Sequence, residues 1–368
     1  MKIPNSLKKI GIEQAIGYLE KDPVANLPKL LNWVDRFSRG SFATQRRYFH
    51  MVVDDKDNNW YRLIMDILTN VDKNVLMTTF TNFFLNASII GWETQDACRE
   101  KYGCNIPWAI LLDPTSACNL HCKGCWAAEY GNKLNLSFDD IDSIVEQGKA
   151  LGCYMYIYTG GEPLVRKDDI IKLCEKHSDC EFMSFTNGTL LDDKFTDDML
   201  RVCNFMPVVS VEGDERTTDA RRGEGTYKKV VAAMNRLKAK NLPFGISACT
   251  TSENVKTICS SEYYDQMIEW GAKFCWFFAY MPVGVDAVPS LMLNSEQREW
   301  MYHTVRDFRY KKSLFTLDFF NDGQYVGGCI AGGKRYLHIN ANGDMDPCVF
   351  MHYSDSNIHE KTLLDGLR

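Results

Sequence analysis

The chain has 368 residues, of which 45% are apolar and 24% are charged, and its formal net charge is −6. This composition is typical of a soluble globular protein with two domains or one large α/β domain with additions. The negative charge gives no electrostatic reason to expect a nucleic-acid partner. No apolar run follows the lysines at the start of the sequence, so no secretory signal peptide is predicted. A cytoplasmic, reducing location is the expectation, in which clustered cysteines indicate metal binding or catalysis.

Residues 1–104 are predicted to form an N-terminal helical domain. Apolar residues recur there at helical spacing, as in VANLPKLLNWVDRF and NWYRLIMDILTNV. Residues 74–92 carry no charge and are long enough to cross a bilayer. However, Asn, Thr and Ser interrupt this stretch, and its bulkiest groups recur at helical spacing. The favoured interpretation is a buried or groove-lining helix, with a peripheral membrane contact second and a membrane span third.

From residue 105 to residue 312, short apolar runs of strand length alternate with amphipathic helical stretches. Six strands are predicted, in WAILLDP, YMYIYTG, EFMSFTNG, FMPVVSVEG, PFGISACT and FCWFFAYMP. This alternation indicates an α/β fold with a parallel sheet. Residues with functional chemistry follow the strands, where the active sites of β/α barrels lie, so a partial (β/α)6 barrel is predicted. Residues 313–368 are predicted to add a short β-hairpin that turns at NANGD.

Three cysteines stand within eight residues after the first predicted strand: Cys118, Cys122 and Cys125. A [4Fe–4S] cluster usually has four cysteine ligands, so three on one loop leave one iron open to a small molecule. A structural zinc site needs four closed ligands, and His121 is the candidate for the fourth. Its position next to Cys122 makes tetrahedral closure awkward, because adjacent side chains point apart. The spacing therefore favours an iron–sulfur cluster.

The second predicted strand ends in Gly160, Gly161, Glu162 and Pro163. Glycines let a backbone approach a ligand closely, and the Glu162 carboxylate suits a cationic partner such as an amine. A glycine turn after a strand is the simpler explanation of this stretch taken alone. Next to the cysteine loop, a ligand site is the better explanation.

The C-x3-C-x2-C loop followed by GGEP one strand–helix unit later resembles the radical S-adenosylmethionine (SAM) superfamily, over about residues 106–285. The resemblance implies that the three cysteines bind a [4Fe–4S] cluster and that the amine and carboxylate of SAM chelate its open iron. An electron then cleaves a C–S bond of SAM, and the resulting 5′-deoxyadenosyl radical abstracts hydrogen from a substrate. A reducing electron donor such as flavodoxin or ferredoxin is also implied.

The resemblance extends to further candidate SAM-binding residues. GGEP is expected to meet the methionine amine. Thr186 and Asn187 end the third strand and could face the ligand, although the turn chemistry of NG explains them equally well. Ser210 and Arg222 match positions that bind the ribose and the carboxylate, and a guanidinium suits a carboxylate. Arg222 or its neighbouring arginine could instead be a surface residue, and Glu212 is a candidate for the ribose hydroxyls.

One position departs from the pattern of the superfamily. Many members carry an aromatic residue directly before the third cysteine, where it packs on adenine. Here that residue is Gly124, and the aromatic Trp126 follows the cysteine. Trp126 is a candidate for the same contact, with packing inside the barrel as the alternative.

Cys329 and Cys348 bracket the predicted hairpin and resemble the start of a SPASM or twitch domain, which binds auxiliary [4Fe–4S] clusters. Two cysteines cannot complete a cluster, so the segment looks truncated, with His352 and His359 as substitute ligands or ordinary surface residues. Sulfatase-maturating enzymes, which this layout also resembles, carry an acid after the second cysteine. Here that residue is Val349, which lowers the case for a sulfatase substrate.

Two classes of function remain. The first is a radical SAM enzyme that acts on a small molecule, on a peptide or protein, or on a lipid or other apolar substrate. Analogy to SPASM domains favours the peptide, and the Phe-rich stretch 74–92 favours the apolar substrate. The second class is a non-catalytic iron–sulfur protein for electron transfer or regulation, which needs neither GGEP nor the Ser210 and Arg222 pair. Binding of SAM distinguishes the two classes.

Overall fold

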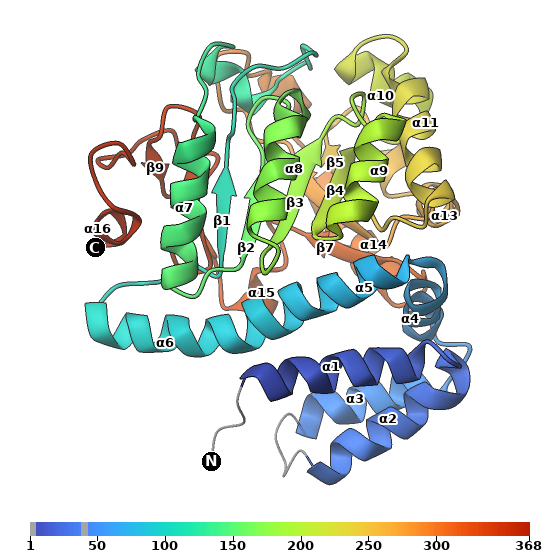
Figure 1. Ribbon diagram of the computed structural model, residues 1–368. Coiled ribbons are helices and arrows are strands. Elements are labelled where there is room, and N and C mark those ends of the chain that lie inside the picture. Colours follow the sequence, from blue (N-terminus) through green and yellow to red (C-terminus); the bar gives the residue numbers. More distant parts are fainter. Residues whose placement is uncertain (1–4, 38–42) are drawn as a thin grey trace.

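The computed structural model describes residues 5–37 and 43–368 (Figure 1). Within them, nine strands form one sheet in the order β7-β6-β5-β4-β3-β2-β1-β8-β9. Neighbouring strands run parallel, except that β9 is antiparallel to β8. The strands are β1 Ala109–Leu112, β2 Met155–Tyr158, β3 Glu181–Thr186, β4 Phe205–Ser210, β5 Gly245–Thr250, β6 Phe274–Ala279, β7 Phe315–Asp318, β8 Tyr336–Ile339 and β9 Met345–Asp346.

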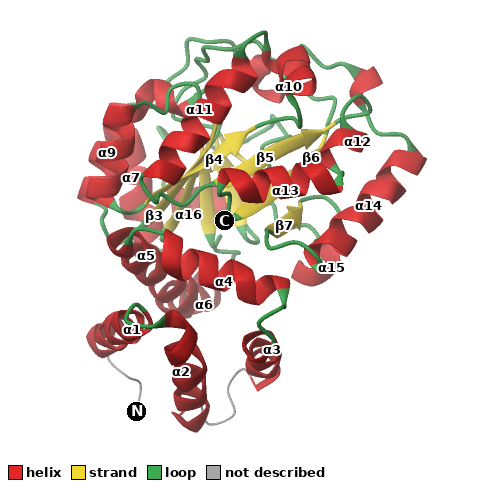
Figure 2. Ribbon diagram, turned by 90° about the vertical axis from the view of Figure 1, so that its right-hand side faces the viewer, coloured by secondary structure: helices red, strands yellow, loops and turns green. Residues whose placement is uncertain are grey.

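Helices follow the parallel strands and cover the outside of the sheet, which forms the predicted partial barrel (Figure 2). Side-chain caps fix where several of them begin. Ser137 and Asp140 form a capping box at the first of these helices, and Asn294 and Gln297 form another. The helices are α7 Phe138–Ala150, α8 Lys167–Lys176, α9 Asp193–Val202, α10 Glu215–Arg222, α11 Thr226–Ala239, α12 Val255–Ile258, α13 Ser261–Trp270, α14 Ser295–Arg309, α15 Gly323–Val326 and α16 Leu363–Leu367.

The C-terminal segment continues the same sheet. All six predicted strands are present, but β7 adds a seventh strand beside β6, so the sheet extends past residue 312. The predicted hairpin is formed by β8 and β9, and His338 pairs with Asp346 in it. Strand β8 also pairs in parallel with β1, with His338 opposite Leu111. The hairpin therefore extends the barrel sheet at the edge formed by its first strand.

The N-terminal region is helical, as predicted. It contains α1 Asn5–Leu19, α2 Pro23–Phe37, α3 Ala43–Asp54, α4 Asn59–Asn70, α5 Lys73–Thr79, the π-helix η1 Phe80–Ile90, and α6 Gly91–Tyr102. The last three join into one 30-residue helix, which is long and apolar enough to cross a membrane by length and composition alone. In the structure this long helix lies across the amino ends of the barrel strands, and α1–α3 lie on its other side (Figure 1).

Amide side chains fasten the long helix to the barrel. Asn82 donates to the carbonyls of Ser178 (3.0 Å) and Cys180 (2.9 Å). Gln95 donates to the carbonyl of Gly152 (2.8 Å). Cys180 and Gly152 are buried residues that precede strands, where a carbonyl without a hydrogen-bond partner would cost free energy.

Apolar contacts complete this closure. Ala87 is fully buried in a cluster with Met155 inside the barrel, and Phe83 packs edge-to-face on Trp108 with 5.5 Å between ring centroids. The favoured interpretation of residues 74–92, a buried or groove-lining helix, therefore describes one face of this segment. Its other face exposes Phe84 and Ile89.

Candidate active site

A cavity of about 650 Å³ extends from the carboxyl ends of the strands into the barrel. Most of the residues predicted from the sequence meet there. Pro163 and Glu212 do not line the cavity. The predicted residues that line it are Cys118, Cys122, Cys125, Trp126, Gly160, Gly161, Glu162, Thr186, Asn187, Ser210, Arg222, Cys329 and Cys348.

The loop after β1 presents the three cysteines to the cavity. A backbone hydrogen bond from the Cys125 N–H to the Cys122 carbonyl (3.2 Å) closes a turn within this loop. The Lys123 N–H donates to the carbonyl of Arg221 at the end of α10 (2.8 Å), which ties the loop to the fourth strand–helix unit. Burial raises the pKa of the Cys118 thiol to about 11 and also raises that of Cys125. Thiols held this way become good ligands only when a metal replaces their protons.

The structure explains why a glycine precedes the third cysteine. Gly124 has φ +67°, and a Cβ added there would lie 2.6 Å from the hydroxyl of Tyr280. Tyr280 directly follows β6, lines the cavity and is held by a hydrogen bond from the Val288 N–H (2.9 Å). The aromatic ring missing beside the cysteines in the sequence is thus supplied from the far side of the barrel.

The two glycines after β2 are required by close packing within the protein. Gly160 has φ +95°, and a Cβ there would lie 2.7 Å from Asp113. A Cβ on Gly161 would lie 2.3 Å from the carbonyl oxygen of Ala117, in the cysteine loop. The pair therefore lets the β2 turn press against the cysteine loop, in addition to lining the cavity.

Glu162 is a buried carboxylate that organises the ends of β2 and β3. It accepts hydrogen bonds from the hydroxyl of Thr186 (2.7 Å) and from the backbone N–H of Asn187 (2.7 Å) and Leu164 (3.0 Å). Burial raises its pKa, although these hydrogen bonds act in the opposite direction. Glu162 thus brings Thr186 and Asn187 to the cavity wall.

Glu212 holds two arginines. Its Oε1 accepts from Nη1 of Arg221 (2.6 Å) and from Nε (2.8 Å) and Nη2 (2.6 Å) of Arg222, and its Oε2 accepts from the Cys249 N–H (3.0 Å). Burial favours the neutral carboxyl, but the two guanidinium groups outweigh it and lower the pKa of Glu212. Both carboxylate oxygens are engaged within the protein.

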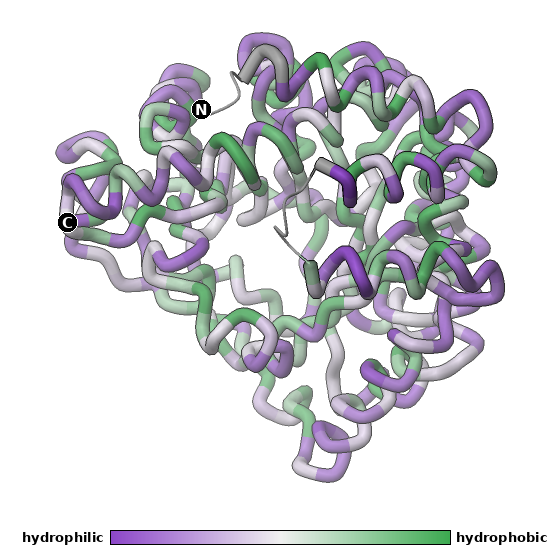
Figure 3. Tube along the Cα trace, turned by 90° about the horizontal axis from the view of Figure 1, so that it is seen from below, coloured by the Kyte–Doolittle hydropathy of each residue, from purple (hydrophilic) through white to green (hydrophobic). Residues whose placement is uncertain are grey.

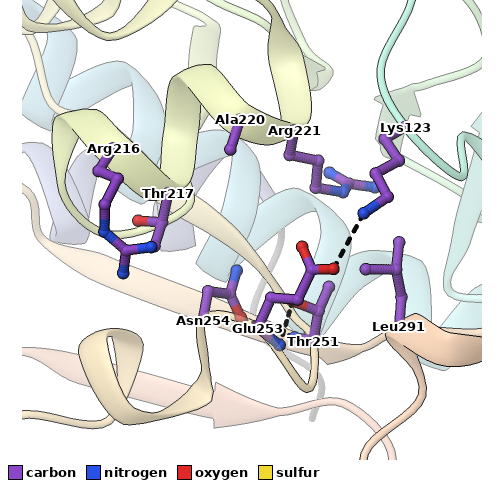
Figure 4. Close-up of a pocket in the computed structure, with 9 residues that line it drawn as sticks. All are labelled: Lys123, Arg216, Thr217, Ala220, Arg221, Thr251, Glu253, Asn254 and Leu291. Atoms are coloured by element: carbon purple, nitrogen blue, oxygen red, sulfur yellow. Dashed lines mark hydrogen bonds and ion pairs between the residues drawn. The ribbon is translucent and has the colours of Figure 1, made fainter.

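The arginine pair connects this carboxylate to the cysteine loop. Nη1 of Arg222 lies 3.9 Å from Sγ of Cys122, and both arginines line the cavity. A smaller pocket of about 40 Å³ lies beside Arg221 (Figure 4). In it, Lys123 of the cysteine loop pairs with Glu253 at 2.9 Å. Both side chains of that pair are solvent-exposed, so it contributes little stability.

Trp126 packs mainly against the C-terminal segment. Its ring centroid lies 6.1 Å from that of Phe350, 6.2 Å from that of His338 and 6.0 Å from that of His352. It also lines the cavity, and its contact with adenine stays a prediction.

A buried charge cluster joins β1 to the β8–β9 hairpin. Nε2 of His338 lies 3.0 Å from Asp113, and Nδ1 lies 3.4 Å from Asp346. Burial lowers the pKa of His338, but the two carboxylates more than offset this and raise it to about 9. The imidazolium therefore fixes the hairpin to the strand that precedes the cysteine loop.

Cys329 and Cys348 line the same cavity. The hydroxyl of Tyr336 donates to Sγ of Cys348 (3.1 Å). His352 contacts Tyr130 and Trp126, and His359 lies near Asp140 (3.6 Å). An auxiliary cluster at these cysteines stays a prediction.

The interior of the cavity is apolar and aromatic. Phe185 stacks on Trp276 with 5.1 Å between centroids, and Phe278 packs edge-to-face on both rings. Leu111 and Ile157 supply further aliphatic wall. Sequence reasoning missed this wall, together with Tyr280 and Arg221. The signal was present, because these aromatic residues lie on or directly after predicted strands.

The three cysteines fit an iron–sulfur cluster better than a single ion. In the described part of the chain, no group of three His, Cys, Asp or Glu side chains is placed to hold one metal ion. In a cubane cluster each thiolate binds a different iron, so the thiols surround a volume instead of converging on a point. The open cavity beside the loop supplies that volume.

Comparison with known proteins agrees with this geometry. Residues 112–258 match the model of the Radical SAM superfamily. The chain contains a radical SAM domain. The superfamily uses a [4Fe–4S] cluster and SAM, so both cofactors belong to the domain.

Individual relatives are distant. AdoMet-dependent heme synthase of Methanosarcina barkeri is 24% identical over 287 residues, which is 70% of this chain and 81% of that protein. SuiB of Streptococcus suis, solved bound to S-adenosylmethionine, gives a TM-score of 0.60 at 17% identity and covers 82% of this chain and 79% of its own. Native anSMEcpe with bound AdoMet gives a TM-score of 0.57 at 20% identity and covers 69% of this chain and 79% of its own. The two solved structures support the fold of the radical SAM domain.

Proposed function

We propose that this protein is a radical SAM enzyme whose cluster is held by Cys118, Cys122 and Cys125. The observation that carries the proposal is that the three thiols share one cavity with Gly161 and Arg222. When bound, the cluster and SAM supply a 5′-deoxyadenosyl radical that abstracts a hydrogen atom from a substrate. An external reductant such as ferredoxin or flavodoxin supplies the electron.

The residues of the cavity bind and orient SAM. Arg222 offers its Nη1, which lies 3.9 Å from Sγ of Cys122, to the carboxylate of SAM, while Glu212 fixes its other two nitrogens. Glu212 is thus a positioning residue, in place of the ribose contact expected from the sequence. Ser210 lies at the end of β4 with its side chain on the cavity wall and is available to the ribose.

Two aromatic residues suit the adenine. Tyr280 occupies the space above Gly124, directly beside the cysteine loop. Trp126 directly follows the last cysteine of that loop and packs against Phe350. We propose that Tyr280 supplies the main ring contact, because Trp126 is already surrounded by the C-terminal segment.

The substrate occupies the apolar part of the cavity. The aromatic wall of Phe185, Trp276 and Phe278 excludes water and offers few hydrogen-bonding groups, which favours a lipid or another apolar molecule. A peptide is the second candidate, because SuiB has been solved bound to its precursor peptide SuiA. That likeness carries the fold but not the substrate.

Anaerobic reconstitution with iron and sulfide tests the proposal. About four irons per chain, together with 5′-deoxyadenosine after addition of dithionite and SAM, are expected for the cysteine loop alone. About eight irons would add an auxiliary cluster at Cys329 and Cys348. A cluster that neither binds nor cleaves SAM would contradict the proposal and favour electron transfer.

Deuterium labelling tests the substrate class. The abstracted atom ends in 5′-deoxyadenosine, so a deuterated lipid extract should label that product, whereas a deuterated peptide digest should not. Label from the peptide fraction alone would replace the apolar substrate with the second candidate.

A further inference from the structure

Exposed large apolar side chains are denser along the N-terminal helices than along the rest of the described chain. Eleven of the 22 large apolar side chains exposed in the described residues lie between Ile10 and Trp92, which is less than a quarter of the chain. Single exposed apolar residues are normal on any protein, but their concentration in one small region marks an interaction surface.

Helix α2 carries one exposed stripe. Lys29, Trp33 and Arg36 are spaced by four and three residues, which places them on one face of the helix. Trp33 is 57% exposed, while Leu27 and Leu31 on the other face are buried. The stripe therefore alternates cation, aromatic ring and cation on the outer face.

Helix α3 carries a second stripe of the same kind. Arg47, Tyr48 and Met51 share a face, and the Arg47 guanidinium lies 5.7 Å from the centre of the Tyr48 ring. Tyr48 is 57% exposed and Met51 is 61% exposed, whereas Val53 is buried.

The two stripes face away from one shared core. Leu27 and Leu31 of α2 and Val53 of α3 meet in a single buried cluster. The opposite sides of both helices therefore face solvent. We call Lys29, Trp33, Arg36, Arg47, Tyr48 and Met51 the α2–α3 face.

The charge of this region is opposite to that of the whole protein. Residues 1–50 contain nine Lys and Arg against four Asp and Glu, whereas the formal net charge of the chain is −6. No carboxylate in the described residues forms an ion pair with Lys29, Arg36 or Arg47. These cations are therefore available to an anionic partner.

We propose that the α2–α3 face docks the protein on the surface of an anionic lipid bilayer. Tryptophan and tyrosine are suited to the bilayer interface, and lysine and arginine are suited to its phosphates. Helices with a basic, aromatic face lie in the plane of that interface. In Figure 1 these helices lie below the long helix, on the side of the molecule opposite to the carboxyl ends of the strands.

Charge decides between the bilayer and a second copy of the chain. A two-fold symmetric dimer through this face would place Lys29, Arg36 and Arg47 against the same cations of the partner. An anionic headgroup surface neutralises them instead. The proposal does not rest on the proposed function, because it uses no residue of the cavity.

Vesicle sedimentation tests this proposal on the full chain. The protein should sediment with vesicles of phosphatidylcholine mixed with phosphatidylglycerol and stay in solution with phosphatidylcholine alone. Each removed charge should weaken binding about fivefold, so K29Q, R36Q and R47Q together should weaken it on the order of 100-fold. High salt should release the wild-type protein.

A matched control carries the same change of charge elsewhere. Lys133, Lys229 and Lys256 are exposed and lie outside the N-terminal helices, so K133Q, K229Q and K256Q together should leave binding unchanged. Equal losses in both triple variants would overturn the docking face, since only net charge would then matter.

A single aromatic substitution keeps the test valid if the triple variant unfolds. Y48S should weaken vesicle binding, while Y310S, at a tyrosine that is 72% exposed on the barrel, should not. Absence of sedimentation with anionic vesicles at low salt would overturn the proposal. A dimer in light scattering that Y48S dissociates, without vesicle binding, would assign the face to a second copy instead.

Discussion

The amino ends of the strands are covered by one continuous helix, whereas separate loops surround an open cavity at their carboxyl ends. The closure at the amino end uses apolar contacts and neutral amides such as Asn82 and Gln95. The carboxyl end buries charges, among them Glu212 with Arg221 and Arg222. Buried ion pairs add little net stability compared with apolar packing. The difference indicates that stability is concentrated at one end and ligand binding at the other.

Two buried glutamates illustrate the difference between the two ends of the barrel. Glu181 begins β3 at the amino end and accepts from the hydroxyl of Thr79 (3.2 Å), and burial raises its pKa to about 8. Glu212 at the carboxyl end is as deeply buried, but two guanidinium groups lower its pKa. At neutral pH the same residue type is therefore mostly protonated at the amino end and ionised at the carboxyl end.

The largest expected effect is on the cluster. C122A should abolish cluster assembly, because two remaining cysteines cannot hold a [4Fe–4S] cluster. Iron and sulfide content after anaerobic reconstitution measures this. C98A, which changes a thiol outside the cavity, should keep the wild-type iron content. Equal iron in both variants would remove Cys122 from the ligand set.

The next effect separates the carboxyl end from the exposed surface. E212Q should lower the free energy of unfolding by about 3–5 kcal/mol, because two buried guanidinium groups lose their counterion. Urea denaturation measures this loss. E215Q, which changes an exposed partner of Lys228, should cost no more than about 1 kcal/mol. A small effect of E212Q would mean that the arginines relax into solvent.

At the amino end, replacing a buried glutamate by glutamine should stabilise the protein instead of destabilising it. The folded pKa of Glu181 is about 8 against a model value of 4.5, so the folded state retains a proton that the unfolded state loses. Its contribution to stability is therefore lost as pH rises from about 4.5 to about 8. E181Q should raise stability by about 3 kcal/mol at neutral pH and change it little at pH 4. Denaturation at both pH values measures the difference, and a destabilised E181Q at neutral pH would contradict it.

The smallest effect concerns the long helix. N82A removes the donor to the Ser178 carbonyl and one of two donors to the Cys180 carbonyl, which Asn204 also reaches (3.1 Å), so it should destabilise the protein by about 0.5–1.5 kcal/mol. Thermal unfolding measures this change. N132A, at an exposed loop position, should be neutral. If N82A also altered SAM affinity, the two ends would be coupled.

Much of the barrel could be predicted from the sequence, because six apolar runs of strand length alternate with amphipathic helices. Strand β7 is not predicted because its buried positions, Thr316 and Asp318, are polar and its first residue, Phe315, is exposed. The pairing of β8 with β1 joins residues far apart in the chain, which no local pattern records.

The candidate site divides in the same way. The cysteine loop and GGEP are local motifs and were found. The role of Glu212 depends on which buried cation reaches it in the fold, and the sequence suggested a ribose contact instead. The reason for a glycine at position 124 could not be predicted either, because Tyr280, which leaves no room for a Cβ there, is distant in the sequence. Residues whose partners are distant in the sequence require the structure.

The most direct test measures equilibrium binding of SAM to two reconstituted variants, one changed at the carboxyl end of the barrel and one changed at the amino end. R222A should weaken binding by about 1.5–3 kcal/mol, because it removes a charged hydrogen bond to the SAM carboxylate. N82A should bind SAM as tightly as the wild type while unfolding more easily. Unchanged affinity in R222A, or equal losses in both variants, would contradict the assignment of SAM binding to the carboxyl end.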